Sequence, residues 1–327
     1  MALGGRPGRR LAAGTAGHPV NAKEADPALA RAARALCARH GLPFTSVRPL
    51  AVGAANEVYA LSTGLVLRVA LAGQVVNPER EAALSGAARA CGVRTPKVIA
   101  WAGPGNPFGR AYIIFERVYG ELLDLAPLTD SRRRAACRAL GGDLARWHAR
   151  RAPSTAPLAG LPRDAPRDPR TSLSDLTRAG RLDRDSARWL EGWFNRLASQ
   201  ALPEPELVLL HGDVRPTNVL VTPKTGRYTA LIDWGDAHWG DPAAEFATLS
   251  LSDAAATLAG YRRGRPGQED VSEARILWVH LSWAISALAR EPRPQEQIWS
   301  APPAARLLHL TRFFLDGAPP VWRSLLR

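Results

Sequence analysis

The chain has 327 residues, of which 46% are apolar and 22% charged, so it is long enough to bury a large core in two lobes about a cleft. Its three cysteines, Cys37, Cys91 and Cys137, form no CxxC pair, which argues against a disulfide framework or a cysteine-rich zinc site and fits a reducing cytoplasm. Basic residues outnumber acidic ones by 43 to 30, but the charge is mostly scattered arginine, so it does not predict a nucleic-acid partner.

The first residues, 1–22, are basic and rich in Gly, Ala and Pro, and they lack the apolar run of a signal peptide. We expect a disordered tail there. The most apolar later stretch, 276–289, is too short to span a bilayer and carries His280, so it is predicted to be a buried helix. No membrane segment is expected.

The first third of the chain has the pattern of a small sheet with helices. Helical spacing at 27–40 is followed by short apolar runs, two of which are separated by the turn signal Ser62-Thr63-Gly64. This pattern indicates an antiparallel meander. A helix is predicted from Pro78 to Cys91, and two further apolar runs follow it, so the first 118 residues are expected to hold five strands with one interposed helix.

The rest of the chain is mainly helical in pattern. The Pro- and Arg-rich stretch 151–170 is predicted to be a loop. One segment of another kind, LVLLHGDVRPTNVLV followed by YTALIDWGD, consists of two apolar runs that each end in polar residues. Helices are expected at 129–150, 183–200, 244–261 and 271–290.

Polar side chains follow both of these apolar runs. Asp213 and Asn218 stand after the first run and Asp233 after the second, in a block, 201–250, with three basic and seven acidic residues. Gathered negative charge in a basic protein favours a metal. Transfer of a terminal phosphoryl group needs a carboxylate to orient the attacking hydroxyl and accept its proton, which we assign to Asp213, and oxygen ligands for magnesium, which we assign to Asn218 and Asp233. The alternative is a pair of solvated turns, since Asp, Asn and Gly are common in turns.

These motifs resemble a known family. HGDVRPTN is similar to the HxDxxxxN catalytic loop, and IDWGDAHWGDP to the segment that follows it, in the aminoglycoside phosphotransferase and choline kinase superfamily. The resemblance implies an α+β, bilobal, protein-kinase-like fold. Its N-terminal lobe, 23–118, would hold a five-stranded antiparallel sheet plus a helix and end in a hinge; its C-terminal lobe, 119–327, would be mainly helical, carry the catalytic loop and include an acceptor-site insertion at about 151–206.

The resemblance also implies roles for individual residues. Asp213 would be the catalytic base, Asn218 and Asp233 would hold magnesium, and His211 would support the loop structurally. Asp241, in Gly240-Asp241-Pro242, would brace the second motif without touching substrate.

Four residues of the first lobe match the family's phosphate-binding positions. Gly53 and Asn56, in GAANEVY, lie in a segment similar to the family's phosphate-covering loop, although a plain hairpin turn fits the same residues. Arg68 stands where the family has a basic residue that contacts the α- and β-phosphates, and Glu81 matches its helix partner. Many members have lysine at that position, and a surface arginine on an edge strand is the alternative interpretation.

The segment YIIFERVYG resembles the hinge between the lobes. Backbone groups of Glu116 and Val118 would bind the adenine edge, and Phe115 would lie behind the base or be an ordinary core aromatic. His148, in LGGDLARWH, is expected to be a packing residue and not a catalyst. Cofactors implied are ATP, with GTP as an alternative, and Mg²⁺.

The acceptor regions carry little net charge. Residues 151–206 sum to +1 and 251–327 to +3, whereas an enzyme for polycationic aminoglycosides would be expected to have an acidic acceptor wall. We therefore expect an antibiotic that is not strongly cationic, such as a macrolide or a nucleoside-type compound, inactivated by O-phosphorylation. Five tryptophans of these regions could line an apolar pocket or belong to the core: Trp189, Trp193, Trp278, Trp283 and Trp299.

Other functions stay open at this point. The same fold would serve a metabolic or biosynthetic kinase for choline, homoserine, a sugar or a natural-product intermediate. A catalytically inactive nucleotide-binding scaffold is a remote alternative, and protein kinase activity is disfavoured because HGD replaces HRD and no APE-like segment follows. The expected partner is a small-molecule hydroxyl acceptor, with no nucleic acid and no membrane, for a cytoplasmic monomer or homodimer.

Overall fold

The protein is represented by a computed structural model, which describes residues 18–19, 26–53, 55–61, 64–149, 158, 160–164, 168–201, 206–267, 271–291 and 299–326. The expected tail lies outside these residues except for His18–Pro19, and so does most of the expected loop 151–170. Two compact units are present, one of Met1–Ala82 with Val98–Arg117 and one of Ala83–Lys97 with Val118–Arg327. Within the described ranges, no helix is both long enough and apolar enough to cross a membrane.

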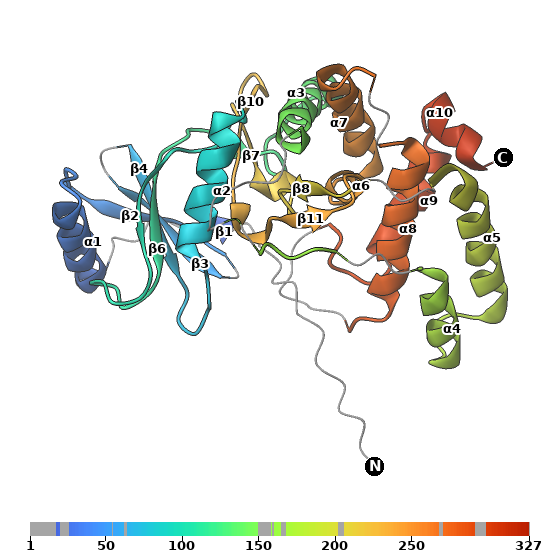
Figure 1. The fold of residues 1–327 in the computed structure, drawn as a ribbon, viewed down its shortest axis with the longest axis horizontal. Coiled ribbons are helices and arrows are strands. Elements are labelled where there is room, and N and C mark those ends of the chain that lie inside the picture. The colour runs from blue at the N-terminus through green and yellow to red at the C-terminus, as the bar shows by residue number, and fades with distance from the viewer. Residues whose placement is uncertain are drawn as a thin grey trace, which may run out of the picture. The chain divides into compact units, whose positions relative to one another are not determined.

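The first unit is built on one antiparallel sheet (Figure 1). The five predicted strands are confirmed, and a two-residue strand from the expected tail pairs with the edge of the sheet. In spatial order the strands are β1 (His18–Pro19), β2 (Val47–Val52), β3 (Asn56–Leu61), β4 (Leu65–Ala70), β6 (Tyr112–Glu116) and β5 (Val98–Ala102).

Helix α1 (Pro27–Arg39) supplies the cover for this sheet. The helix begins at Asp26, whose side chain accepts a hydrogen bond from the Ala28 N–H, and proline stands at its first position. Leu36 packs in one apolar cluster with Leu67 of β4 and Ile114 of β6, all fully buried. This packing fixes which face of β4 is buried and leaves Arg68 on the opposite face, because side chains alternate along a strand. Helix α2 (Pro78–Ala90) begins in this unit and ends in the second.

The second unit is mainly helical, as predicted. The expected helix 244–261 is wrong as a single element: it is two helices, interrupted at 248–250. There the Thr248 hydroxyl donates to the Val214 carbonyl, and Ser250 caps the following helix by accepting from the Asp253 N–H. The helices are α3 (Asp130–His148), α4 (Arg170–Arg178), α5 (Arg184–Ala201), α6 (Ala243–Ala247), α7 (Leu251–Gly264), α8 (Glu273–Leu288), α9 (Ala305–Leu315) and α10 (Pro320–Arg323).

Helices α3 and α7 lie side by side in the second unit (Figure 1). Glycines make their close approach possible. A Cβ atom at Gly141 of α3 would overlap the backbone carbonyl of Thr257, and one at Gly260 of α7 would overlap the carbonyl of Arg138. The two helices therefore touch backbone to backbone. Trp147 of α3 also packs against Trp234, the residue after Asp233, at 4.9 Å between ring centroids.

Two small antiparallel sheets hold the polar motifs of this unit. The eight residues HGDVRPTN lie between two short strands of the segment 207–221. One sheet has the order β10 (Tyr228–Leu231), β9 (Val219–Val221), β7 (Glu121–Leu122), and the other pairs β11 (His238–Gly240) with β8 (Val208–Leu210). The polar residues thus follow the ends of β8 and β10.

Candidate active site

The loop after β8 turns sharply at Gly212. This residue has φ +87°, and a Cβ atom on it would overlap the backbone carbonyl of Asp236. Glycine is therefore required both by the backbone conformation and by the lack of space. The turn buries the next residue, Asp213, to 2% exposure at the end of an apolar strand.

Both carboxylate oxygens of Asp213 are bound. The Asn218 side-chain amide donates to Oδ2 at 2.8 Å and to the Asp213 backbone carbonyl at 2.9 Å. The Arg215 Nε atom lies 2.6 Å from Oδ1. The structure thus brings together two of the three residues expected to act on the phosphoryl group, and it fixes the orientation of the carboxylate.

Asp233 follows β10 and joins this loop through the backbone. The Ile232 N–H donates to the Asn218 carbonyl at 2.9 Å, which ties the two motifs together. Asp233 has φ 70° and ψ 73°, and it is the one non-glycine residue with positive φ in the described part of the chain. Such strain at a polar residue is typical of functional sites.

Negative charge accumulates around Asp213. The pKa of Asp213 is raised to about 7, chiefly by burial and also by the nearby carboxylates of Asp233 and Asp236, against the opposing effect of Arg215. Burial and Asp233 likewise raise the pKa of Asp236 to about 6. Carboxylates that repel one another in a buried site are stabilised by a cation.

These residues fit a magnesium ion by their chemistry. Asn218 and Asp233 offer oxygen atoms, which Mg²⁺ prefers, and the carboxylates of Asp213 and Asp236 add negative charge that favours a cation. No group of three or more His, Cys, Asp or Glu side chains in the described ranges is arranged to hold a metal on its own. An ion held by one carboxylate, one amide and nucleotide phosphates does not need such a group.

The ring of His211 is buried, and within the described residues its two nitrogens hydrogen-bond to backbone groups. Its Nε2 atom lies 3.1 Å from the Ile232 carbonyl oxygen, which can only accept, so Nε2 donates and Nδ1 accepts from the Asp213 N–H at 3.2 Å. Burial lowers the pKa of His211, which keeps the ring neutral. The ring also packs edge-on against Trp234 at 4.6 Å.

Two acidic residues brace the loops. Glu245 of α6 is fully buried and accepts from the backbone N–H groups of His211 and of Gly212, the latter at 3.2 Å. His148 lies beneath it, with Nε2 3.9 Å from Glu245 Oε1. Asp241 accepts from the Ala243 N–H at 2.8 Å and from Arg275 Nε at 2.6 Å.

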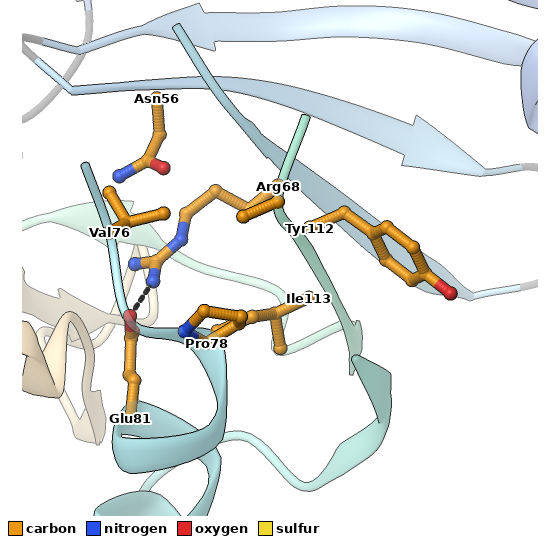
Figure 2. Close-up of a pocket in the computed structure, with 8 residues that line it drawn as sticks. Asn56, Arg68, Val76, Pro78, Glu81, Tyr112 and Ile113 are labelled. Atoms are coloured by element: carbon orange, nitrogen blue, oxygen red, sulfur yellow. Dashed lines mark hydrogen bonds and ion pairs between the residues drawn. The ribbon is translucent and has the colours of Figure 1, made fainter. Parts of the chain in front are cut away.

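The first unit gathers several residues expected to bind nucleotide (Figure 2). Arg68 on β4 forms an ion pair with Glu81 on α2, and the Asn56 side chain points toward the same guanidinium. The Arg68 guanidinium also lies 5.5 Å from the centroid of the Phe115 ring. Arg68 is therefore a partly buried, paired residue and not a surface arginine. A small recess here is lined by Asn56, Arg68 and Glu81 together with Val76, Pro78, Ala111, Tyr112 and Ile113.

The other expected nucleotide contacts are placed as follows. The Gly53 N–H donates to the Asn56 carbonyl at 2.7 Å and closes the turn between β2 and β3, in which residue 54 lies outside the described ranges. Glu116 is the last residue of β6, and Val118 lies just after it, where the second unit resumes.

A comparison of sequences gives the family of this chain. Residues 46–276, well over half of the chain, match a sequence model described as the phosphotransferase enzyme family. The chain belongs to this family. The resemblance seen in the two motifs is thereby confirmed. A search of curated proteins gave no match.

Solved structures share the fold of this phosphotransferase family member at low identity. A spectinomycin phosphotransferase in complex with ADP and spectinomycin has a TM-score of 0.56 and 13% identity, covering 94% of this chain and 98% of its own. The GDP complex of aminoglycoside 2′-phosphotransferase-IIIa has a TM-score of 0.55 and 16% identity, covering 92% of this chain and 96% of its own. A choline/ethanolamine kinase family protein from Mesorhizobium loti has a TM-score of 0.52 and 19% identity, covering 83% of this chain and 88% of its own. The bilobal, kinase-like fold prediction is confirmed.

Several residues of this phosphotransferase site were not predicted. Arg215 lies inside HGDVRPTN and Asp236 inside IDWGDAHWGDP. Both occupy variable positions, and a motif defines only its fixed positions, so the motifs did not indicate these two residues. His238 was also missed: its Nδ1 lies 2.7 Å from the Asp236 carbonyl oxygen and its Nε2 3.2 Å from Asp164 Oδ2. Asp164 reaches it because its N–H donates to the Trp239 carbonyl at 2.8 Å. Residues 164 and 238 are far apart in the sequence, so no local sequence pattern predicts that they interact.

Proposed function

We propose that the protein is an ATP- and magnesium-dependent O-phosphotransferase that transfers the γ-phosphate to a hydroxyl group of a small molecule. One observation carries this proposal. Asp213 is a buried carboxylate, fixed through both oxygens and lying among the negative charges of Asp233 and Asp236, with a pKa raised to about 7. A general base is most effective when its pKa is near the working pH.

Asp213 acts on the acceptor. Its carboxylate orients the attacking hydroxyl and takes its proton as the oxygen attacks phosphorus. Asn218 and Arg215 hold the carboxylate in one orientation, which reduces the entropy lost on reaching the transition state. His211 and Glu245 stabilise the backbone of the same loop and exchange no proton with substrate.

Asn218 and Asp233 would hold the magnesium ion. When bound, the ion would supply positive charge that neutralises the negative charge developing on the transferred phosphoryl group. Asp236 adds negative charge beside Asp233 and strengthens the attraction for the cation.

Most of the nucleotide contacts in this proposal come from the first unit, and Val118 is the first residue of the chain after it. Arg68, oriented by Glu81, would contact the α- and β-phosphates, and Gly53 and Asn56 would cover them. The backbone at Glu116 and Val118 would bind the base, with Phe115 behind it. Solved structures of the fold hold ADP or GDP, which supports a nucleotide substrate of either kind.

The acceptor is an antibiotic that is not strongly cationic, and the activity inactivates it in the cytoplasm. The near-neutral charge of 151–206 supports this choice over a polycationic aminoglycoside. The spectinomycin phosphotransferase with the same fold supports an antibiotic as the class of acceptor.

A panel of hydroxyl-bearing antibiotics incubated with ATP and Mg²⁺ tests the proposal. We expect one added phosphoryl group in the mass of the product, and no product when Mg²⁺ is chelated or when Asp213→Asn replaces the wild type. Turnover confined to polycationic aminoglycosides would contradict the acceptor class, and absence of turnover with every alcohol would contradict the reaction.

The same fold in a choline/ethanolamine kinase family protein favours a second candidate, a metabolic or biosynthetic kinase. A host that expresses the protein discriminates the two. Reduced sensitivity to one antibiotic supports inactivation, whereas unchanged sensitivity to the whole panel, together with turnover of a metabolite, supports the metabolic kinase.

A further inference from the structure

A buried arginine near the end of the chain has an unusual environment. Arg306, in the first turn of α9, is 8% exposed. Its guanidinium carbon lies over two indole rings, 5.1 Å from the centroid of Trp283 and 5.0 Å from that of Trp299. Its Nη1 atom donates to the Ala247 carbonyl at 2.8 Å. Within the described residues, these two cation–π contacts and this one hydrogen bond are the interactions of the Arg306 guanidinium.

This cation is paired with no carboxylate in the described part of the chain. The pKa of Arg306 is lowered to about 9, chiefly by burial and also by the charged side chains that act on it, Arg215 and Arg290, because both are positive. Arg306 in turn helps to lower the pKa of His280, to about 3, and of His309, after burial in both cases. The surroundings of Arg306 therefore carry uncompensated positive potential.

Two hydrogen bonds at the C-terminal end of α6 link Arg306 to the loop that holds Asp213. It binds the carbonyl of Ala247, and the next residue, Thr248, donates to the carbonyl of Val214 at 2.6 Å. Val214 stands between Asp213 and Arg215. The Arg215 Nη1 atom is buried and finds no hydrogen-bond acceptor among the described residues, while its Nε binds Asp213. Two guanidinium groups thus have unused donor capacity close to the proposed base.

A purely structural role does not account for these features. A neutral side chain with one N–H donor would link α9 to the Ala247 carbonyl equally well. Burying a full positive charge without a counter-ion is strongly unfavourable, and cation–π contacts recover only part of that cost. A bound anion would satisfy both arginines.

We propose that Arg306, together with Arg215 Nη1, forms a subsite for an anionic group, a carboxylate or a phosphate, carried by the acceptor substrate. This inference rests on the proposed phosphotransferase function and narrows its acceptor to alcohols that also bear an oxyanion. Arginine suits this task because its planar donors match two oxygens at once. Trp283 and Trp299 form apolar walls that keep water from Arg306 and strengthen the ion pair.

Matched acceptors test the subsite through specificity. Each hydroxy acid that is turned over is compared with its own primary amide, which keeps the hydroxyl and the shape and removes the charge. For the wild type we expect kcat/KM to favour the acid by at least about tenfold, mostly through KM, because a buried charge pair is involved. In Arg306→Gln, which retains an N–H donor for Ala247, the acid should lose this preference, and Arg306→Lys should keep most of it.

A matched control comes from the same helix. Arg312→Gln removes the same charge from an exposed position of α9 and should leave the ratio of acid to amide at the wild-type value. A ratio near one in the wild type, or a ratio that Arg306→Gln does not change, would overturn the subsite.

Direct titration separates this inference from the proposed function. Inorganic phosphate, added at constant ionic strength without nucleotide, should change the tryptophan fluorescence of the wild-type protein saturably, since Trp283 and Trp299 flank Arg306. Arg306→Gln should abolish the change and Arg312→Gln should preserve it. If no alcohol is phosphorylated while this pattern is found, the subsite stands and the proposed reaction fails; a response equal in wild type and Arg306→Gln overturns the subsite.

Discussion

Arg215 binds the oxygen of Asp213 that Asn218 leaves free: its Nε atom lies 2.6 Å from Oδ1, whereas the Asn218 amide donates to Oδ2 at 2.8 Å. The pair of contacts fixes the carboxylate plane in the absence of any substrate. Asp213 is thus preorganised, and its neighbours differ in what they contribute. Arg215 opposes the rise in its pKa, and Asp233 promotes it.

The first prediction concerns the base itself. Asp213→Asn preserves the size of the side chain but cannot accept the proton, so kcat should fall by about a thousandfold or more. The dissociation constant for nucleotide, measured by calorimetry with Mg²⁺, should change by less than about threefold because Asp213 is neither an expected nucleotide contact nor an expected magnesium ligand. A variant with near-normal kcat would show that another group accepts the proton.

The second prediction separates two aspartates that stand three residues apart. Asp233→Asn should remove Mg²⁺-dependent nucleotide binding, since it replaces the one expected carboxylate ligand. Asp236→Asn removes the same charge from a residue that is not an expected ligand, so it should raise the Mg²⁺ concentration needed for half-maximal activity by only about threefold to tenfold. Titration of activity with Mg²⁺ measures both. Equal effects of the two substitutions would contradict the assignment of Asp233 as the ligand.

The third prediction tests how α6 supports the catalytic loop. Glu245→Ala leaves the buried N–H groups of His211 and Gly212 without an acceptor, which should reduce the free energy of unfolding by about 2 to 4 kcal/mol. Glu245→Asp retains a carboxylate one methylene further away and should recover part of the loss. Thermal unfolding of the three proteins is the measurement, and an Ala variant as stable as the Asp variant would rule out this support.

Local patterns in the sequence predicted the elements of this fold well. The strands around Arg68 and the helix of Glu81 follow from apolar periodicity. The motifs indicated Asp213, Asn218 and Asp233 as candidates because phosphoryl transfer restricts which residue types are useful, and their roles stay predictions. The break between α6 and α7 was missed because Ala, Glu, Phe and Leu all favour helix there. The interruption depends on a distant acceptor, the Val214 carbonyl that takes the Thr248 hydroxyl bond.

Contacts between distant segments could not be predicted. Arg306 is separated by 91 positions from Arg215, and nothing in the local pattern distinguishes it from the other arginines of a basic chain. The same holds for the bond between Asp164 and His238. Of the five tryptophans considered, Trp278 is buried and Trp189 is 58% exposed, and periodicity alone did not separate them.

The fourth prediction concerns pH. Burial alone would lower the pKa of His238, but its hydrogen bonds to Asp164 and to the Asp236 carbonyl raise it from 6.5 to about 9. The protonated form is therefore favoured in the folded protein, and its stabilisation is fully present below pH 6.5 and is lost as the pH rises through about 9. Because Asp164 is 57% exposed, solvent screening limits the contribution to about 1 kcal/mol.

His238→Gln measures this contribution. The difference in melting temperature between wild type and variant should be largest near pH 6 and should shrink toward zero near pH 10, since other groups titrate alike in both proteins. A difference that stays constant across this range would mean that His238 contributes packing and not charge.

The last prediction uses two adjacent glycines of α3. Gly141 faces α7, where an added Cβ atom would overlap the Thr257 carbonyl and approach the Tyr261 nitrogen to 2.7 Å, whereas a Cβ at Gly142 would meet only the end of the Arg146 side chain at 4.0 Å. Gly141→Ala should therefore destabilise the second unit by about 3 kcal/mol or more, since backbone on both helices must move apart. Gly142→Ala should stabilise it by up to about 1 kcal/mol, because alanine favours helix over glycine. Denaturant unfolding of the two variants measures this difference. Because the variants are identical in composition, the comparison isolates the packing of α3 on α7 from helix propensity. Variants of equal stability would show that these helices are not in backbone contact.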